Sequence, residues 1–180
     1  MESKFFILLA AAALLFTACN REKTYKNEIT WNGETRPLNG SVQHWPDRTE
    51  YYISGWTDLE DENDHPEYDF NCEILKKDLN KTFDLAAGNT SDQNGYCIWA
   101  NKFYSPENHW FTNKYCETWG DAWEGHINGE PYDNTSIFKS GTMTITLDDD
   151  AIILSLDGVL KDGDTFTVDL YIPKEEFVSR

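Results

Sequence analysis

The chain has 180 residues and is strongly acidic, with 15 Lys and Arg against 32 Asp and Glu and a formal net charge of -17. A field of this sign repels nucleic acid and anionic lipid headgroups, so nucleic acid is not an expected partner. The length suits one domain with a substantial buried core.

The first segment of the chain has the features of a secretory signal. A short charged head precedes the apolar run 5–16, and two small residues separate this run from Cys19. This order is typical of a cleaved leader, and the run is shorter than the about 20 residues of a transmembrane helix. We therefore expect a signal peptide over 1–18, followed by a polar tether over 19–27.

The domain itself is expected over 28–180, and it begins with a hairpin. Two short β-type segments, 28–31 and 34–38, flank Asn32-Gly33, a pair that favours a tight hairpin turn. Pro37 lacks a backbone N–H, so it predicts that the second segment lies at a sheet edge.

An acidic run at 58–67 has two interpretations, a calcium loop or a solvated connection between strands. Asn63 stands where a calcium-loop match that starts at Asp58 requires glycine. We therefore interpret the run as a solvated loop.

Further strands are predicted on both sides of this loop. Segments 49–56 and 96–103 are rich in β-branched and aromatic residues. Between them, apolar and polar residues alternate, which predicts a strand whose core face carries Tyr68, Phe70, Cys72 and Ile74. Segment 75–85 is interpreted as a short helix or a loop.

Segment 96–123 is unusually aromatic, and two interpretations fit it. Its rings form part of the core, or they form an exposed platform on which sugar rings stack. The platform interpretation selects Trp110, Trp119 and Trp123, with hydrogen-bonding groups from Asp121, Glu124, Asn113 and His126. Because Trp119 and Trp123 are four residues apart, one helical turn would place them on the same face.

The last forty residues predict a three-stranded meander. Alternation marks strands at 141–147, 151–156 and 164–172, with an acidic turn at 148–150. Asp157-Gly158 and Asp162-Gly163 are both interpreted as hairpin turns. Many short strands and no long helical segment predict an antiparallel β-sandwich, with a lipocalin-like β-barrel as the alternative.

The cysteines give an incomplete disulfide pattern. Besides Cys19 the chain has Cys72, Cys97 and Cys116, an odd number, so one disulfide would leave one thiol. Cys97 with Cys116 is the preferred pair, Cys72 with Cys97 is second, and a fully reduced set is a third possibility. The spacings do not match a zinc site.

No catalytic motif stands out in the sequence. The four histidines have no partner at metal-ligand spacing, and no zinc-protease, nucleophile-elbow or phosphate-loop motif occurs. Carboxylates are abundant, and only their separation in space would identify a glycosidase pair. We expect neither enzymatic activity nor a metal or cofactor.

The segment Phe16-Thr17-Ala18-Cys19 resembles a bacterial lipobox, and segments 141–146 and 156–164 are similar to the closing meander of small Bacteroidota lipoproteins. The resemblance implies cleavage before Cys19, acylation of its thiol and anchoring to the bacterial outer membrane by lipid. Segment 20–23 lacks the acidic stretch that accompanies surface export in that group, so a surface-facing and a periplasm-facing anchor both fit.

The resemblance also implies glycan capture or adhesion. The leading hypothesis is a lipid-anchored, non-catalytic envelope protein that binds glycan or another extracellular ligand. A structural or adhesive surface subunit is the competing class, and a barrel that encloses an apolar ligand is the third.

Overall fold

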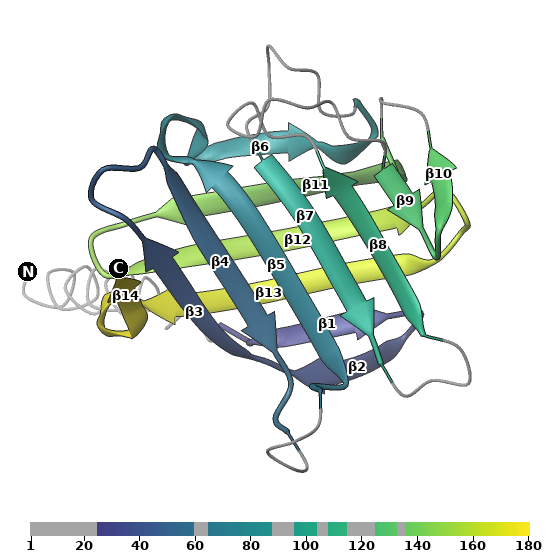
Figure 1. Cartoon of the computed structure of the whole chain (residues 1–180), viewed down its shortest axis with the longest axis horizontal. Coiled ribbons are helices and arrows are strands. Elements are labelled where there is room, and N and C mark those ends of the chain that lie inside the picture. The colour runs from purple at the N-terminus through teal and green to yellow at the C-terminus, as the bar shows by residue number, and fades with distance from the viewer. Residues whose placement is uncertain (1–24, 60–64, 88–95, 104–107, 115–124, 133–135) are drawn as a thin grey trace, which may run out of the picture.

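The computed structural model describes residues 25–59, 65–87, 96–103, 108–114, 125–132 and 136–180, which form two stacked β-sheets (Figure 1). Sheet A contains β1 (Glu28–Trp31), β2 (Glu34–Pro37), β6 (Lys81–Asp84), β11 (Phe138–Leu147), β12 (Ala151–Leu160) and β13 (Thr165–Pro173). Sheet B contains β3 (Asn39–His44), β4 (Glu50–Trp56), β5 (Tyr68–Leu75), β7 (Tyr96–Lys102), β8 (His109–Lys114), β9 (Gly125–Ile127), β10 (Glu130–Tyr132) and β14 (Phe177–Ser179).

The strand order is β2-β1-β13-β12-β11-β6 in sheet A and β10-β9-β8-β7-β5-β4-β3-β14 in sheet B. The described strand pairs are antiparallel except β14, which runs parallel to β3. The described strands form two separate sheets and no closed barrel. The predicted antiparallel sandwich is confirmed, and the barrel alternative is wrong.

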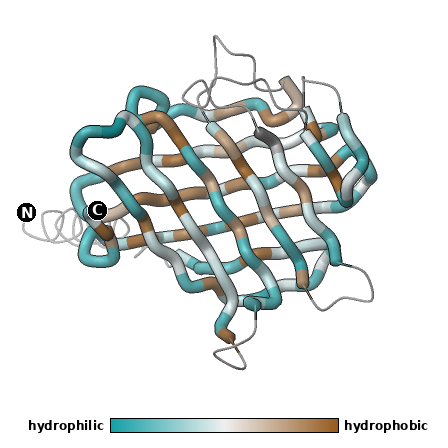
Figure 2. The backbone as a smooth tube through the Cα atoms, in the orientation of Figure 1, coloured by the Kyte–Doolittle hydropathy of each residue, from teal (hydrophilic) through white to brown (hydrophobic). Residues whose placement is uncertain are grey.

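The core lies between the two sheets because alternate side chains of each strand point inward. Figure 2 shows the resulting alternation of apolar and polar residues along the strands. In β13 the buried residues are those that the alternation predicts: Phe166, Val168, Leu170 and Ile172. Trp31 lies at the centre of an aromatic group, with its ring centroid 5.0 Å from that of Phe166 and 5.5 Å from that of Phe111. Such ring pairs add about 0.5–1.5 kcal/mol each beyond their buried area.

The opening hairpin has the predicted turn and the predicted edge. Asn32 and Gly33 both have positive φ angles, 51° and 82°, as a tight turn between twisted strands requires. Strand β2, which ends at Pro37, lies at the edge of sheet A.

One of the two predicted C-terminal turns is wrong. Asp157-Gly158 lies inside β12, which continues to Leu160, and the chain turns only at 161–163. A Cβ atom at Gly158 would come within 2.8 Å of two ring carbons of Phe138. This glycine therefore marks a close approach of an aromatic ring and not a turn.

Segment 75–85 contains an edge strand that alternation did not predict. A 3₁₀ helix at Lys76–Asp78 precedes β6, and a second begins at Leu85. Strand β6 has four residues, of which only Phe83 is buried, so it is too short to show an alternation of apolar and polar residues. Its pairing with β11 identifies it as a strand.

Ion pairs connect the two sheets at one end of the sandwich. Arg36 of β2 donates two hydrogen bonds to Glu67, at 2.8 and 3.0 Å, just before β5 begins. Lys102, at the end of β7, donates to Glu34 of β2 at 2.9 Å. These contacts fix the edge of sheet A against the ends of two strands of sheet B.

Candidate functional site

The outward side of sheet B carries the rings and polar groups that a binding platform needs. None of the described elements crosses in front of this side in Figure 1. We call this surface the outer aromatic face and define it by residues whose side chains alternate with core residues: Tyr52, Ser54, Trp56, Asp69, Asn71, Glu73, Trp99, Asn101, Trp110, Thr112 and His126.

Strand register arranges these residues in rows across the sheet. One row follows the pairs Ser54–Asn71, Asn71–Trp99, Trp99–Thr112 and Thr112–His126. The adjacent row follows the pairs Trp56–Asp69, Asp69–Asn101 and Asn101–Trp110. Trp99 and Trp110 are therefore diagonal neighbours on β7 and β8, within reach of large side chains.

The rings of this face occur in two contacting pairs. The centroids of Tyr52 and Trp99 are 5.5 Å apart, across the intervening strand β5. The rings of Trp110 and His126 stack at 6.3 Å with an interplanar angle of 28°. These four side chains are partly exposed, so a ligand can reach part of each ring.

A chain of hydrogen bonds lies beside the first ring pair. The Tyr52 hydroxyl donates to Asn71 Oδ1 at 2.9 Å, and Asn71 Nδ2 donates to Asp69 Oδ1 at 2.9 Å. Asn71 is only 5% exposed, so this network holds its amide in one orientation. The polar groups beside the rings are thus preorganised.

Burial changes the ionisation of two members of the network. Desolvation raises the pKa of Asp69 above its ordinary value, and hydrogen bonds from Asn71 and Asn101 only partly offset this effect. Desolvation also raises the pKa of the Tyr52 hydroxyl, with smaller contributions from Asp69 and Glu73 that act in the same direction. Around neutral pH, Tyr52 is therefore a hydrogen-bond donor on this face.

The structure separates the described parts of the aromatic segment, 96–103 and 108–112, into core and surface. Tyr96 and Phe111 are fully buried, whereas Trp99 and Trp110 lie on the outer aromatic face. Of the predicted platform residues, the structure brings together Trp110 and His126. The other predicted platform side chains lie outside the described residues: Asn113, Trp119, Asp121, Trp123 and Glu124.

Trp99 lies in the aromatic segment, but the sequence did not select it for the platform, and sequence reasoning also missed Tyr52 and Trp56 as candidate site residues. Their signal was period-two spacing, because Tyr52, Ser54 and Trp56 share one side of β4. Each side of this strand carries both apolar and polar or small residues, so the alternation alone does not show which side faces outward. The pairing with β5 shows it.

The cysteines lie on opposite sides of sheet B. Cys72 pairs in register with Ile98 and points into the core, whereas Cys97 pairs with Glu73 and points outward. Since their Cβ atoms point apart, the second-choice pairing of Cys72 with Cys97 is wrong. Burial raises the pKa of the Cys72 thiol well above its ordinary value, so this thiol is unreactive. Cys19 and Cys116 lie outside the described residues.

The described ends of the acidic run at 58–67 have structural partners. Asp58 accepts a hydrogen bond from Asn39, and Glu67 pairs with Arg36. In the acidic turn, Asp148 Oδ1 accepts from the backbone N–H groups of Asp150 and Ala151. Within the described ranges, no group of His, Cys, Asp and Glu side chains is arranged to hold a metal ion.

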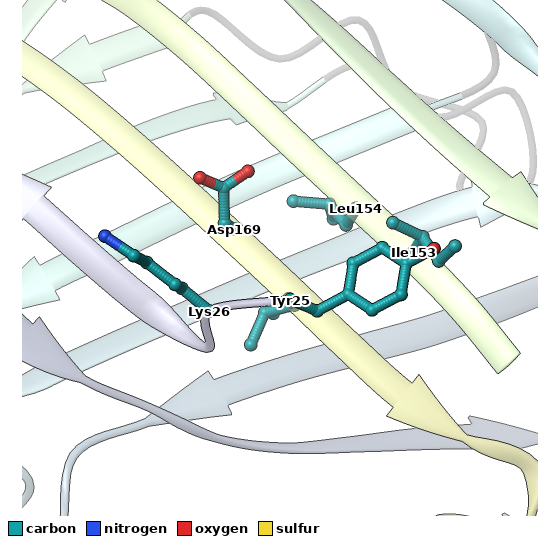
Figure 3. A pocket seen from close by; sticks show the side chains of 6 residues that line it. Tyr25, Lys26, Ile153, Leu154 and Asp169 are labelled. Carbon is teal, nitrogen blue, oxygen red and sulfur yellow. The ribbon is translucent and has the colours of Figure 1, made fainter. Parts of the chain in front are cut away.

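On the opposite surface, the segment that leads into the domain is fixed to sheet A. Tyr25 stacks on Tyr171 with centroids 4.5 Å apart, and Asn27 exchanges two hydrogen bonds with the Tyr171 backbone. Figure 3 shows Tyr25 beside Ile153, at a shallow depression of about 220 Å³ that also reaches Asp169. The depression belongs to the contact between this segment and sheet A.

Comparison of the chain with protein-family models, with curated proteins and with solved structures gave no match. In the described part of the chain, no helix has the length and apolar character needed to span a membrane. The geometry of the outer aromatic face is therefore the basis for inferring function.

Proposed function

We propose that the protein is a lipid-anchored, non-catalytic component of the bacterial cell envelope that binds glycan on the outer aromatic face. The observation that carries this proposal is the combination of partly exposed rings with a fixed polar network on one sheet surface that no other described element covers. Trp99 and Tyr52 flank the buried amide of Asn71, and Trp110 extends the ring surface toward His126.

This combination suits the two kinds of surface that a sugar presents. The C–H groups of a pyranose ring pack on the face of an aromatic ring, and its hydroxyls exchange hydrogen bonds with amides and carboxylates. Rings lose little conformational entropy on binding, and the hydrogen-bonded Asn71 is already oriented. Both features favour ligand binding by a surface that is preformed.

A non-catalytic role is supported by the spacing of the acids on this face. Asp69 and Glu73 are four residues apart on one strand, so their Cα atoms are about 13 Å apart. A retaining glycosidase holds its two carboxyl groups only about 5–5.5 Å apart, which is much shorter than this backbone separation. The spacing therefore does not favour the acid and nucleophile pair of a retaining glycosidase.

The anchor is inferred from the leader and from the lipobox-like Cys19, and the structure suggests how such an anchor would orient the domain. The stretch from Cys19 to Tyr25 spans at most about 20 Å, and Tyr25 packs on the outward side of sheet A. An acylated Cys19 would hold sheet A nearest to the outer membrane. The outer aromatic face, on sheet B, would then be directed away from it.

The test is a glycan array with purified protein, followed by titration of the strongest ligand. Trp99→Ala and Trp110→Ala should each weaken binding by about 5- to 150-fold, if stacking of a sugar on one ring contributes as much as stacking of a nucleobase, on the order of 1–3 kcal/mol. Trp45→Ala is the matched control, since Trp45 lies beyond β3 and packs under Arg48. Binding that survives both substitutions on the face would refute the proposed site.

The anchor is tested separately by mass spectrometry of the protein from a bacterial host. The expected product begins at Cys19 and carries acyl chains, and Cys19→Ala should release the protein from the membrane fraction. An unmodified wild-type protein that retains its leader would refute the anchor.

A further inference from the structure

The contacting rings of the outer aromatic face form two pairs that lie over different strands. Tyr52 is on β4 and Trp99 is on β7, with β5 between them. Their ring centroids are nevertheless only 5.5 Å apart, and the Tyr52 hydroxyl donates to Asn71 of β5 at 2.9 Å. Both rings therefore lean toward each other over β5, and we call them the first ring pair.

The second ring pair lies on the other side of β7. Trp110 of β8 and His126 of β9 stack with their centroids 6.3 Å apart, so this pair covers the boundary between these two strands. Figure 1 shows β5, β7, β8 and β9 following one another across the sheet. Two and a half strand spacings therefore separate β5 from the boundary between β8 and β9, which places the middles of the two ring pairs about 12 Å apart across the strands.

Polar side chains occupy the interval between the two ring pairs. Asn101 of β7 and Thr112 of β8 point outward there, in the two rows that also carry Trp110 and Trp99. Asn101 is partly exposed, and its amide is hydrogen-bonded to Asp69. Across the strands the face therefore presents rings, then an amide, then rings again, and not one continuous aromatic surface.

The distance between the ring pairs exceeds the width of one sugar. A pyranose is a single six-membered ring, similar in width to the ring of Tyr52, so it can stack on one pair but cannot reach both. An oligosaccharide can place one unit on each pair and a unit between them, whose hydroxyls meet the Asn101 amide. Since the units are covalently linked, contact at the second pair becomes intramolecular once the first pair is occupied, which raises the overall affinity.

From this arrangement we infer that the outer aromatic face binds an extended oligosaccharide of about three or more sugar units, whose chain crosses the strands from β5 to β9. The inference rests on the proposed function and specifies its ligand class, which is a linear glycan chain and not a single sugar. The first ring pair is the stronger position, because the oriented amide of Asn71 and the carboxylate of Asp69 lie beside it. The second ring pair adds affinity only for chains long enough to reach it.

The test titrates the purified protein with a length series, from disaccharide to hexasaccharide, of a linear glycan that the array identifies. We expect the affinity to rise steeply between the disaccharide and the tetrasaccharide and then to level off once both ring pairs are occupied. Trp110→Ala should weaken tetrasaccharide binding at least about five-fold, if a sugar stacks as strongly as a nucleobase, and should change disaccharide binding by less than about two-fold.

Two further variants distinguish the ring pairs. Tyr52→Phe retains the ring and removes the hydroxyl that orients Asn71, so it should weaken disaccharide and tetrasaccharide binding by the same factor. His126→Ala removes the ring that stacks on Trp110, so its effect should be confined to the tetrasaccharide and longer chains. Trp45→Ala, away from both ring pairs, should leave the length dependence unchanged. Melting temperatures confirm that the variants fold.

The outcomes separate this inference from the proposed function. A disaccharide that binds as tightly as the hexasaccharide, with both weakened by Trp99→Ala, overturns the extended chain and leaves the binding face in place. Trp110→Ala that weakens every length by the same factor has the same consequence, because the two ring pairs would then contact the same sugar unit. A failure to bind any glycan of a broad array overturns the proposed function and the inference together.

Discussion

Gly158 provides a sharp test of how the core is packed. The residue lies inside β12, and a Cβ atom there would be 2.8 Å from Cδ1 and from Cε1 of Phe138. Carbon atoms in contact prefer about 3.5–4.0 Å, so Gly158→Ala must displace the ring. Phe138 is itself held by Phe111, with centroids 5.7 Å apart, and is 1% exposed. We expect Gly158→Ala to lower the free energy of unfolding by about 1–3 kcal/mol, the usual cost of overpacking.

A second substitution identifies the ring as the cause. Phe138→Leu removes ring atoms that meet the new methyl group and, by itself, should cost about 1–2 kcal/mol through the space that it leaves. In the double variant the methyl group fills part of that space, so the two losses should be less than additive by about 1 kcal/mol or more.

Urea denaturation of the wild type, the two single variants and the double variant measures this coupling. Asp157→Asn is the control, because this exposed residue on the same strand should change stability by less than about 0.5 kcal/mol. Full additivity, or a Gly158→Ala variant as stable as the wild type, would show that Phe138 does not restrict this position.

Three further predictions concern single interactions. The Thr112 hydroxyl is buried and has no hydrogen-bond partner among the described residues, so Thr112→Val should raise the free energy of unfolding by about 1 kcal/mol. A lower free energy of unfolding in urea denaturation would contradict this. Burial raises the pKa of Asp69, so its carboxyl group binds a proton more tightly in the folded state than in the unfolded state. At a pH above the folded-state pKa, the ionised Asp69 carboxylate therefore lowers the free energy of unfolding. Asp69→Asn should therefore raise the free energy of unfolding around neutral pH, and its gain over the wild type should decrease as the pH falls through the pKa of Asp69. A gain that stays constant in denaturation curves over the acidic range would refute this prediction. Arg36 and Glu67 are both partly exposed, so a double-mutant cycle with Arg36→Met and Glu67→Gln should give a coupling energy of only about 0.5–1 kcal/mol. This coupling energy should decrease as the salt concentration rises. A larger coupling energy that does not depend on salt would indicate a desolvated pair.

The amino-acid sequence by itself determined the class of fold and many of its strands, because those signals are local. Alternation in β13 predicts which side chains are buried, and Asn32-Gly33 predicts the first turn from backbone preferences alone. Asp157-Gly158 shows the limit of local reasoning. The same dipeptide favours a turn, but it also occurs within a strand where the glycine leaves room for an aromatic ring.

Where both sides of a strand are apolar, only the tertiary structure decided which side faces the core, and it alone decided which distant rings meet. In β7, Tyr96 and Ile98 alternate with Cys97 and Trp99, so both sides are apolar and the period of two assigns neither to the interior. The pairing with β5 turns Trp99 outward, and the pairing with β8 places Trp110 beside it. The outer aromatic face depends on contacts between strands far apart in the chain, and no local preference specifies them.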